Sequence, residues 1–284
     1  MDSLMSLTVF FAVILAAFFH AIWNVMVKKG DDKYISLTAI VLGHIPISIV
    51  IIFFTPAISV QSIPYIFISA IFLTGYEWCL ISAYRLEDFT KVYPIARGTA
   101  PIFIVLLSLF LFDLDISKFE LMGILVISFG IIILSFQNIK TFKNYPAVMY
   151  ALGTGLFISC YSISDGYGGR ASASPLNYTA WLFILNAITF SILLTIMNKS
   201  GVVKKVFREG KKILIIGGTL SFSVYATIIW GFTQAPVPLV ATLRETSIIF
   251  GLLIGTFFLK EKLTFLKSAA VLTIFFGIIL LKFF

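Results

Sequence analysis

Charged residues are scarce in this chain, and their scarcity excludes an ordinary soluble domain. Asp, Glu, Lys and Arg make up 12% of the 284 residues, while 60% of the residues are hydrophobic. Mean hydropathy is +1.04. Soluble domains carry about a quarter charged residues, so this chain has more apolar surface than a water-exposed fold can hide. We therefore expect an integral membrane protein.

Cysteine and histidine are also scarce, with two of each. Cys79 and Cys160 lie in separate apolar runs and lack the spacing of metal ligands or of a disulfide framework. The sequence contains no metalloprotease, hydrolase or phosphate-loop motif. We expect no metal, no cofactor and no enzymatic activity, with a membrane-embedded enzyme kept as a less favoured alternative.

Long apolar runs, in contrast, are abundant. A helix needs about 20 apolar residues to cross the hydrocarbon layer, and ten runs meet this length. They cover approximately residues 4–27, 34–54, 63–84, 91–112, 118–137, 146–165, 176–197, 212–233, 238–259 and 264–282. The gaps between them are too short for a soluble domain. The pattern predicts an all-α integral membrane protein of ten transmembrane helices.

The two halves of the chain resemble each other at an offset of 147 residues. Arg97-Gly98-Thr99 aligns with Arg244-Glu245-Thr246, and Phe129-Gly130-Ile131 aligns with Phe276-Gly277-Ile278. Because each half has an odd number of helices, the second half must enter the membrane from the opposite side. The sequence therefore predicts two inverted five-helix repeats, residues 1–140 and 145–284. Many transporters use this arrangement to build a central site with two openings.

The distribution of Lys and Arg predicts an orientation and argues against nucleic-acid binding. The formal net charge is +8, but the basic residues fall mostly in the gaps on one face of the predicted bundle. The other face has only Lys118, Arg170 and Lys282. Since Lys and Arg concentrate in cytoplasmic loops, we expect a multi-pass protein of a bacterial plasma membrane with both termini outside.

Several stretches resemble the EamA-type carriers of the drug/metabolite transporter superfamily. They are His20-Ala21-Ile22-Trp23-Asn24, Val92 to Pro101, Asp165 to Gly168, Leu243 to Ser247 and Leu259 to Leu263. The resemblance covers nearly the whole chain. Within the family, the sequence is more specifically similar to a subgroup associated with phosphonate utilisation. It implies solute transport, with helices 1–4 and 6–9 around a central cavity and helices 5 and 10 outside it.

Two features depart from the family pattern. The glutamate of the turn after helix 9, Glu261, has no counterpart in the first repeat, where Asp113-Leu114-Asp115 stands. Larger family members are also expected to keep both termini in the cytoplasm, which is opposite to the orientation that the charge pattern predicts.

Five ionisable residues lie inside the predicted helices, where charge is costly and is usually functional or paired. They are His20, Glu77, Arg97, Arg244 and Glu245. At a rise of about 1.5 Å per residue, Arg97 lies about 9 Å from one face and Arg244 about 9 Å from the other. The remaining candidates for contact with a solute are their neighbours Trp23, Asn24, Tyr93, Tyr161 and Asp165.

Two interpretations of the arginines remain open. A guanidinium presents a planar fork that suits carboxylate, phosphate or phosphonate, so Arg97 and Arg244 would bind an anionic or zwitterionic solute. Alternatively both are structural, with Arg97 paired to Glu77, and Arg244 paired to Glu245 or Asp165.

We predict a secondary-active transporter that moves a small polar metabolite by alternating access. The main alternative is a carrier for a cationic, quaternary-amine or drug-like solute held by aromatic rings. The expected partners are the solute and membrane lipid, without nucleic acid, and a homodimer is left open. His44 and the Gly251–Gly255 pair are expected only to pack within the bundle.

Overall fold

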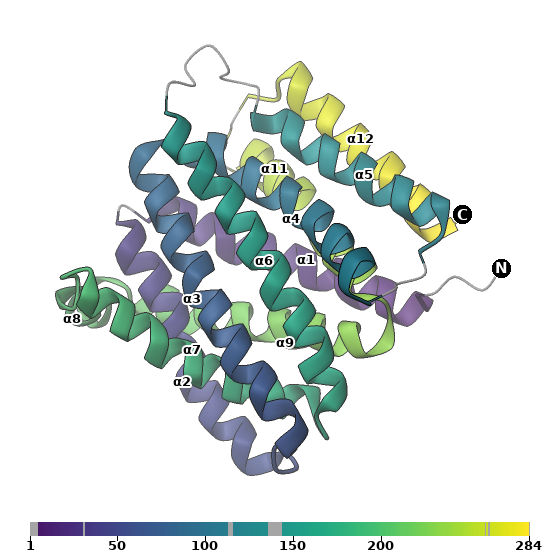
Figure 1. Ribbon diagram of the computed structural model, residues 1–284. Helices are drawn as coiled ribbons and strands as arrows, with labels where there is room; N and C mark the ends of the chain where they lie inside the picture. Colours follow the sequence, from purple (N-terminus) through teal and green to yellow (C-terminus); the bar gives the residue numbers. More distant parts are fainter. Residues whose placement is uncertain are drawn as a thin grey trace.

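The computed structural model describes residues 5–30, 32–112, 116–135, 144–258, 260 and 262–283, and every regular element in them is helical (Figure 1). The first half contains α1 (Leu7–Lys29), α2 (Lys33–Phe54), the short 3-10 helix η1 (Val60–Ser62), α3 (Ile63–Leu86), α4 (Phe89–Phe112) and α5 (Lys118–Ile133). The second half contains α6 (Tyr145–Ala171), α7 (Pro175–Ile196), α8 (Gly201–Glu209), the π-helix η3 (Ile213–Gly217), α9 (Gly218–Gln234), α10 (Val237–Arg244), α11 (Ser247–Phe258) and α12 (Phe265–Phe283).

Ten of these segments correspond to the ten predicted helices. Nine segments of the described chain are long and apolar enough to cross a membrane, counting η1 with α3, η3 with α9, and α10 with α11 as single segments. The tenth is α5, whose 16 described residues span about 24 Å at 1.5 Å per residue. The chain is therefore an all-α membrane protein, as the apolar runs predict. Asp113 to Asp115 and Glu261, where the repeats differ, lie outside the described residues.

Local sequence signals explain where several helices begin. The side chains of Ser6, Asp32 and Ser174 accept backbone N–H groups at the starts of α1, α2 and α7. Ser117 and Glu120 form a reciprocal capping box at the start of α5. These caps satisfy donors that the first helical turn leaves open. Within the bilayer, the helices must satisfy their other backbone groups themselves.

Packing between the helices follows a two-fold relation between the halves. α2 packs on its counterpart α7, and α5 packs on its counterpart α12, beside which it lies in Figure 1. α3 packs on α6 as α9 packs on α1, and α3 packs on α7 as α9 packs on α2. Exchanging the halves thus maps neighbours onto neighbours, as expected of two inverted repeats.

Two facing glycines allow the close approach of α5 and α12. A Cβ atom built on Gly123 would lie 2.9 Å from the carbonyl oxygen of Gly277, and one built on Gly277 would lie 3.0 Å from that of Gly123. The packing role predicted for Gly251 is wrong, because a Cβ atom there would meet nothing within 4 Å. Glycine also allows close approach inside the bundle, where a Cβ atom on Gly218 would lie 2.6 Å from the Cα of Gly43.

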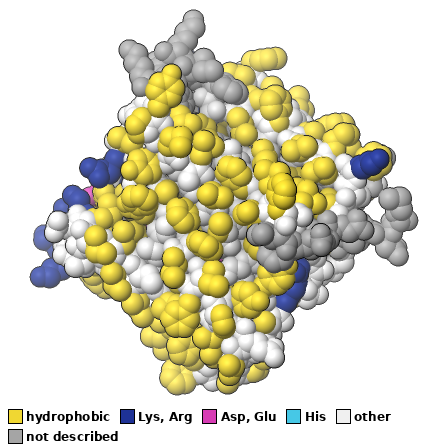
Figure 2. Space-filling model, in the orientation of Figure 1, with side chains coloured by type: hydrophobic (Ala, Val, Ile, Leu, Met, Phe, Trp, Pro, Cys, Tyr) yellow, Lys and Arg dark blue, Asp and Glu magenta, His cyan; other side chains and the backbone are white. Residues whose placement is uncertain are grey.

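The helix α8 lies in the polar gap between the seventh and eighth apolar runs, where the hydropathy pattern predicts no helix. It buries Val202 and Val206 while Lys204 and Arg208 are exposed. The two buried valines pack against Ile35 and Ala39 of α2. In Figure 2 apolar side chains cover most of the visible face, and Lys and Arg side chains gather at the end where α8 lies.

The start of α1 and the end of α12 lie at the side of the molecule opposite α8 (Figure 1). The Lys282 Nζ donates to the carbonyl oxygen of Met5 at 2.7 Å. Both ends therefore lie on one face, as an even number of passes requires. Which face is cytoplasmic stays a prediction from the charge pattern.

Candidate functional site

A central cavity lies among eight of the predicted helices. Its volume is about 80 Å³, room for two or three water molecules at about 30 Å³ each. The lining residues come from α1, α2, α3, α4, α6, α7, α9 and α10. Because α10 begins the ninth predicted helix, this set is helices 1–4 and 6–9. Among the described residues, α5 and α12 contribute none, which confirms the arrangement that the resemblance implies.

Arg97 of α4 and Arg244 of α10 both line this cavity, and they are only 4% and 2% exposed. Glu245 lies between them. Its Oε2 is 2.7 Å from the Nε of Arg97, and its Oε1 is 3.3 Å from an Nη of Arg244. The predicted pair of Arg97 with Glu77 is therefore wrong, because the carboxylate partner of Arg97 comes from the other repeat. One carboxylate for two guanidinium groups leaves this cluster with an excess positive charge.

The helix is irregular beside each arginine. Pro101 has no N–H to donate to the carbonyl of Arg97, four residues before it. In the second repeat α10 ends at Arg244, and the Ile248 N–H donates to the carbonyl of Glu245, only three residues back. Residues 101 and 248 correspond under the repeat, so the regular hydrogen-bond ladder is interrupted at the same place in both halves. Discontinuous helices at mid-membrane are a recurring feature of transporter sites.

Two rings of α1 extend the arginine cluster. The Nε2 of His20 lies 3.1 Å from an Nη of Arg97, and the Trp23 ring packs edge-to-face on His20 with centroids 4.9 Å apart. The Trp23 indole N–H is buried and has no acceptor among the described residues. An unsatisfied buried donor costs about 1–3 kcal/mol. Trp23 itself is one of the residues that line the cavity.

Asn24 and Tyr93, which were both predicted to contact the solute, are not among the residues that line the cavity. Asn24 donates through Nδ2 to the carbonyl of His20 on its own helix at 2.9 Å. Tyr93 offers its ring to Arg97, whose guanidinium carbon lies 5.7 Å from the ring centroid. Both residues therefore position members of the cluster.

Glu77 lies in a different part of the wall, on α3. Asn186 of α7 donates to its carboxylate at 3.2 Å, and no basic side chain of the described chain forms an ion pair with it. Nearby on α7, Phe183 stacks on His44 of α2 with ring centroids 3.9 Å apart. Both imidazole nitrogens are buried without a described partner. His44, Asn186 and Phe183 all line the cavity, and no motif in the sequence marks them as doing so.

Asp165 is not among the residues that line the cavity. Its carboxylate accepts hydrogen bonds from Tyr178 at 2.9 Å and from Tyr225, which ties α6 to α7 and α9. The predicted pair with Arg244 is not formed. Tyr161, one turn earlier on α6, does line the cavity, in edge-to-face contact with Tyr76. In the described part of the chain, no three His, Cys, Asp or Glu side chains cluster as metal ligands would.

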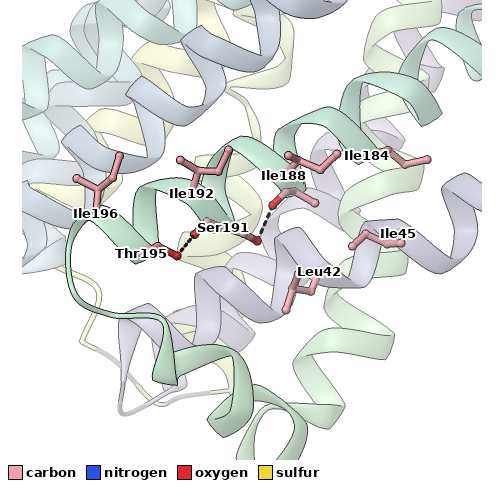
Figure 3. A pocket seen from close by; sticks show the side chains of 9 residues that line it. Leu42, Ile45, Ile184, Ile188, Ser191, Ile192, Thr195 and Ile196 are labelled. Carbon is pink, nitrogen blue, oxygen red and sulfur yellow. Dashed lines mark hydrogen bonds between the residues drawn. The ribbon is translucent and has the colours of Figure 1, made fainter.

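A larger hollow lies between α2 and α7, with a volume of about 520 Å³ (Figure 3). Isoleucines dominate its lining, and Ile188 and Ile192 are more than half exposed. Its two hydroxyls, on Ser191 and Thr195, donate to carbonyls of their own helix. This groove offers nothing to a polar solute and suits lipid chains, so the smaller central cavity is the candidate site.

The comparisons with known proteins agree with this architecture. Residues 7–136 and 145–283 each match the EamA-like transporter family. No curated protein matches the chain. A crystal structure described only as that of a protein matches with a TM-score of 0.73 and 16% identity, over 96% of this chain and 94% of that one. At that identity the likeness shows the fold alone. The two family matches cover nearly all of the sequence, and the chain therefore belongs to the EamA-like transporter family, as a membrane transporter of the drug/metabolite transporter type.

Proposed function

We propose that the protein is a secondary-active carrier that moves a small anionic or zwitterionic metabolite across a bacterial plasma membrane by alternating access. The main support is the arginine pair, one from each repeat, in the wall of one cavity. A guanidinium does not lose its proton in a protein. Two permanent charges inside the membrane are costly and usually serve a function.

The donors around Glu245 suit an anionic group. Arg97 and Arg244 share this single carboxylate, and the indole N–H of Trp23 adds an unpaired donor to the same cluster. A solute carboxylate, phosphate or phosphonate would accept from these groups with charge-assisted hydrogen bonds. Glu245 is then the internal counter-ion of the empty site, which the solute partly displaces.

The repeat provides a route to alternating access. Since Arg97 and Arg244 belong to opposite repeats, rocking one repeat against the other would expose the cluster first to one side and then to the other. The interrupted backbone at Pro101 and at the junction of α10 and α11 lies directly beside the arginines, where a change in helix direction would move them.

The size of the cavity favours a small metabolite over a drug-like solute. Pockets for drug-sized ligands have volumes of about 300–1,000 Å³, whereas this cavity has about 80 Å³. A cation site is the second candidate, because Tyr76, Tyr161 and Tyr225 also line the wall and aromatic faces attract cations. We rank it second, since such a cation would lie in the same small cavity as two arginines.

Uptake by proteoliposomes that contain only the purified chain tests the proposal. The probes are labelled β-alanine, taurine and 2-aminoethylphosphonate, with tetramethylammonium as the cationic probe. We expect at least one of the first three to enter at a rate that saturates with concentration. Uptake of tetramethylammonium alone would move the function to the second candidate. Flux that never saturates would indicate a channel, and chemical conversion of a probe without transport would indicate an enzyme.

A further inference from the structure

One buried carboxylate in the cavity wall, that of Glu77, takes no part in the arginine cluster. Among the buried carboxylates at the centre, Glu245 contacts two arginines and Asp165 accepts from two tyrosines. Glu77 is 4% exposed, and its carboxylate has the neutral side chain of Asn186 as its hydrogen-bond donor. A buried carboxylate without a cation is unfavourable, so Glu77 is suited to a positive group that enters the cavity.

His44 belongs to the same part of the wall. Asn186 and Phe183 are three residues apart on α7 and therefore share a face of that helix. Phe183 stacks on His44, and Asn186 donates to Glu77. The group is defined by its shared place in the cavity lining and not by a continuous chain of contacts, and we refer to these four residues as the acceptor wall. A neutral imidazole has one acceptor nitrogen, and both nitrogens of His44 are buried without a described partner.

We propose that the acceptor wall binds a protonated amine, so that the transported solute is a zwitterion whose anionic group lies at Arg97 and Arg244. This inference rests on the proposed function. An ammonium group has three donors and no acceptor. The carboxylate of Glu77 and the acceptor nitrogen of His44 supply the matching acceptors, and the charge of the ammonium compensates that of Glu77.

The proposed site has two parts of opposite charge preference, the arginine cluster and the acceptor wall, and they are built from different helices. The arginine cluster is built from α1, α4 and α10, and the acceptor wall from α2, α3 and α7. A solute with only one charged group would leave the other part unsatisfied. Sites built to hydrogen-bond a substrate group strongly reject analogues that lack it.

Matched pairs of probes test this selectivity at equilibrium. Calorimetry on the purified full chain would compare β-alanine with propionate, taurine with ethanesulfonate, and 2-aminoethylphosphonate with ethylphosphonate. The members of each pair differ only in the terminal amine. We expect at least one amine-bearing probe to bind about tenfold or more tightly than its partner.

Two variants assign the preference to the acceptor wall. Glu77→Gln keeps the shape of the side chain and should abolish the preference, by weakening the amine-bearing probe while leaving its partner unchanged or tighter. His44→Phe keeps the ring stack on Phe183 and should also weaken the amine-bearing probe. Its melting temperature should not fall, because two unsatisfied buried nitrogens are removed. Glu87→Gln, which removes a carboxylate at the end of the same helix but outside the cavity, should keep the preference.

The outcomes separate this inference from the proposed function. Equal binding of both members of every pair by the wild-type chain would overturn the amine site while leaving the anion site in place. A preference that survives in Glu77→Gln would also overturn it, and would fit a Glu77 that carries a proton instead. Binding of none of the six probes would contradict both proposals.

Discussion

Glu245 forms ion pairs with both arginines of the central cluster. It is fully buried and holds the two arginines from opposite repeats. Replacing it with Gln would leave two buried guanidinium groups without a carboxylate, and breaking a buried ion pair costs about 3–5 kcal/mol. We expect Glu245→Gln to lower the melting temperature in detergent far more than Glu77→Gln, since Glu77 forms no ion pair with a described basic side chain. Equal losses in the two variants would contradict this account of the cluster.

A second prediction at the residue scale concerns pH. The Nζ of Lys91 lies 2.8 Å from the carboxylate of Glu87 at the end of α3, and this hydrogen bond lowers the pKa of Glu87 below its ordinary value of 4.5. A carboxyl group with a lowered folded-state pKa stabilises the fold above its unfolded pKa, and the effect is lost as the pH falls through the folded value. The melting temperature of the wild-type chain should thus exceed that of Glu87→Gln at neutral pH by a small margin. This margin should shrink as the pH falls below 4.5 and vanish only below the lowered folded-state pKa, and a difference that does not change with pH would be inconsistent with the pair.

The sequence identifies the charged residues of the site and includes the pair of Arg244 with Glu245, but it gives the wrong partner for Arg97. Arg97, Arg244 and Glu77 stand out because charge is rare in apolar runs, and all three line the cavity. Their depth follows from counting residues, whereas the direction in which each side chain points depends on how the helix is rotated against its neighbours. For this reason the pair of Arg97 with Glu245 was missed. His44 packs within the bundle as expected, but its place in the cavity wall depends on its contact with Phe183 of α7, which the sequence does not show.

At the scale of elements, hydropathy locates the helices well and their irregularities poorly. The ninth apolar run predicts one continuous helix, but the structure divides it at residues 245 and 246 into α10 and α11. A window of about 20 residues averages over such a break, because α10 and α11 together still form one apolar segment long enough to cross a membrane. The amphipathic α8 was missed for the opposite reason, since its mean hydropathy is that of a polar gap and only its spacing of Val202 and Val206 indicates a helix.

The contact between α5 and α12 gives a prediction at this scale. Gly123→Ala and Gly277→Ala each add one carbon that would lie about 3 Å or less from backbone atoms of the opposite helix, and such overpacking costs about 1–3 kcal/mol. We expect both variants to lower the melting temperature. Gly251→Ala is the matched control, because it adds the same carbon in open space and should be neutral or stabilising. A loss in Gly251→Ala equal to the others would show that the effect is not one of helix contact.

At the scale of the whole molecule, the sequence predicts the ten-helix architecture, because membrane solvation leaves few other folds for such a chain. The orientation still needs measurement. In intact cells, with Cys79 and Cys160 replaced by Ala, an impermeant maleimide should label Lys118→Cys and not Lys204→Cys, since the charge pattern places α8 in the cytoplasm. The reverse labelling would place both termini in the cytoplasm, the orientation that larger family members suggest. The homodimer also stays a prediction.

The central claim is that the two repeats each contribute one arginine to a single solute site. Saturable uptake by proteoliposomes, measured with a probe that the wild-type chain transports, tests it most directly. We predict that Arg97→Ala and Arg244→Ala each reduce uptake by about a hundredfold while the chain stays folded, because Glu245 keeps the other arginine as its partner. Arg208→Ala, on the exposed face of α8, should transport normally. Normal uptake by either cavity variant would remove that arginine from the site and contradict the claim.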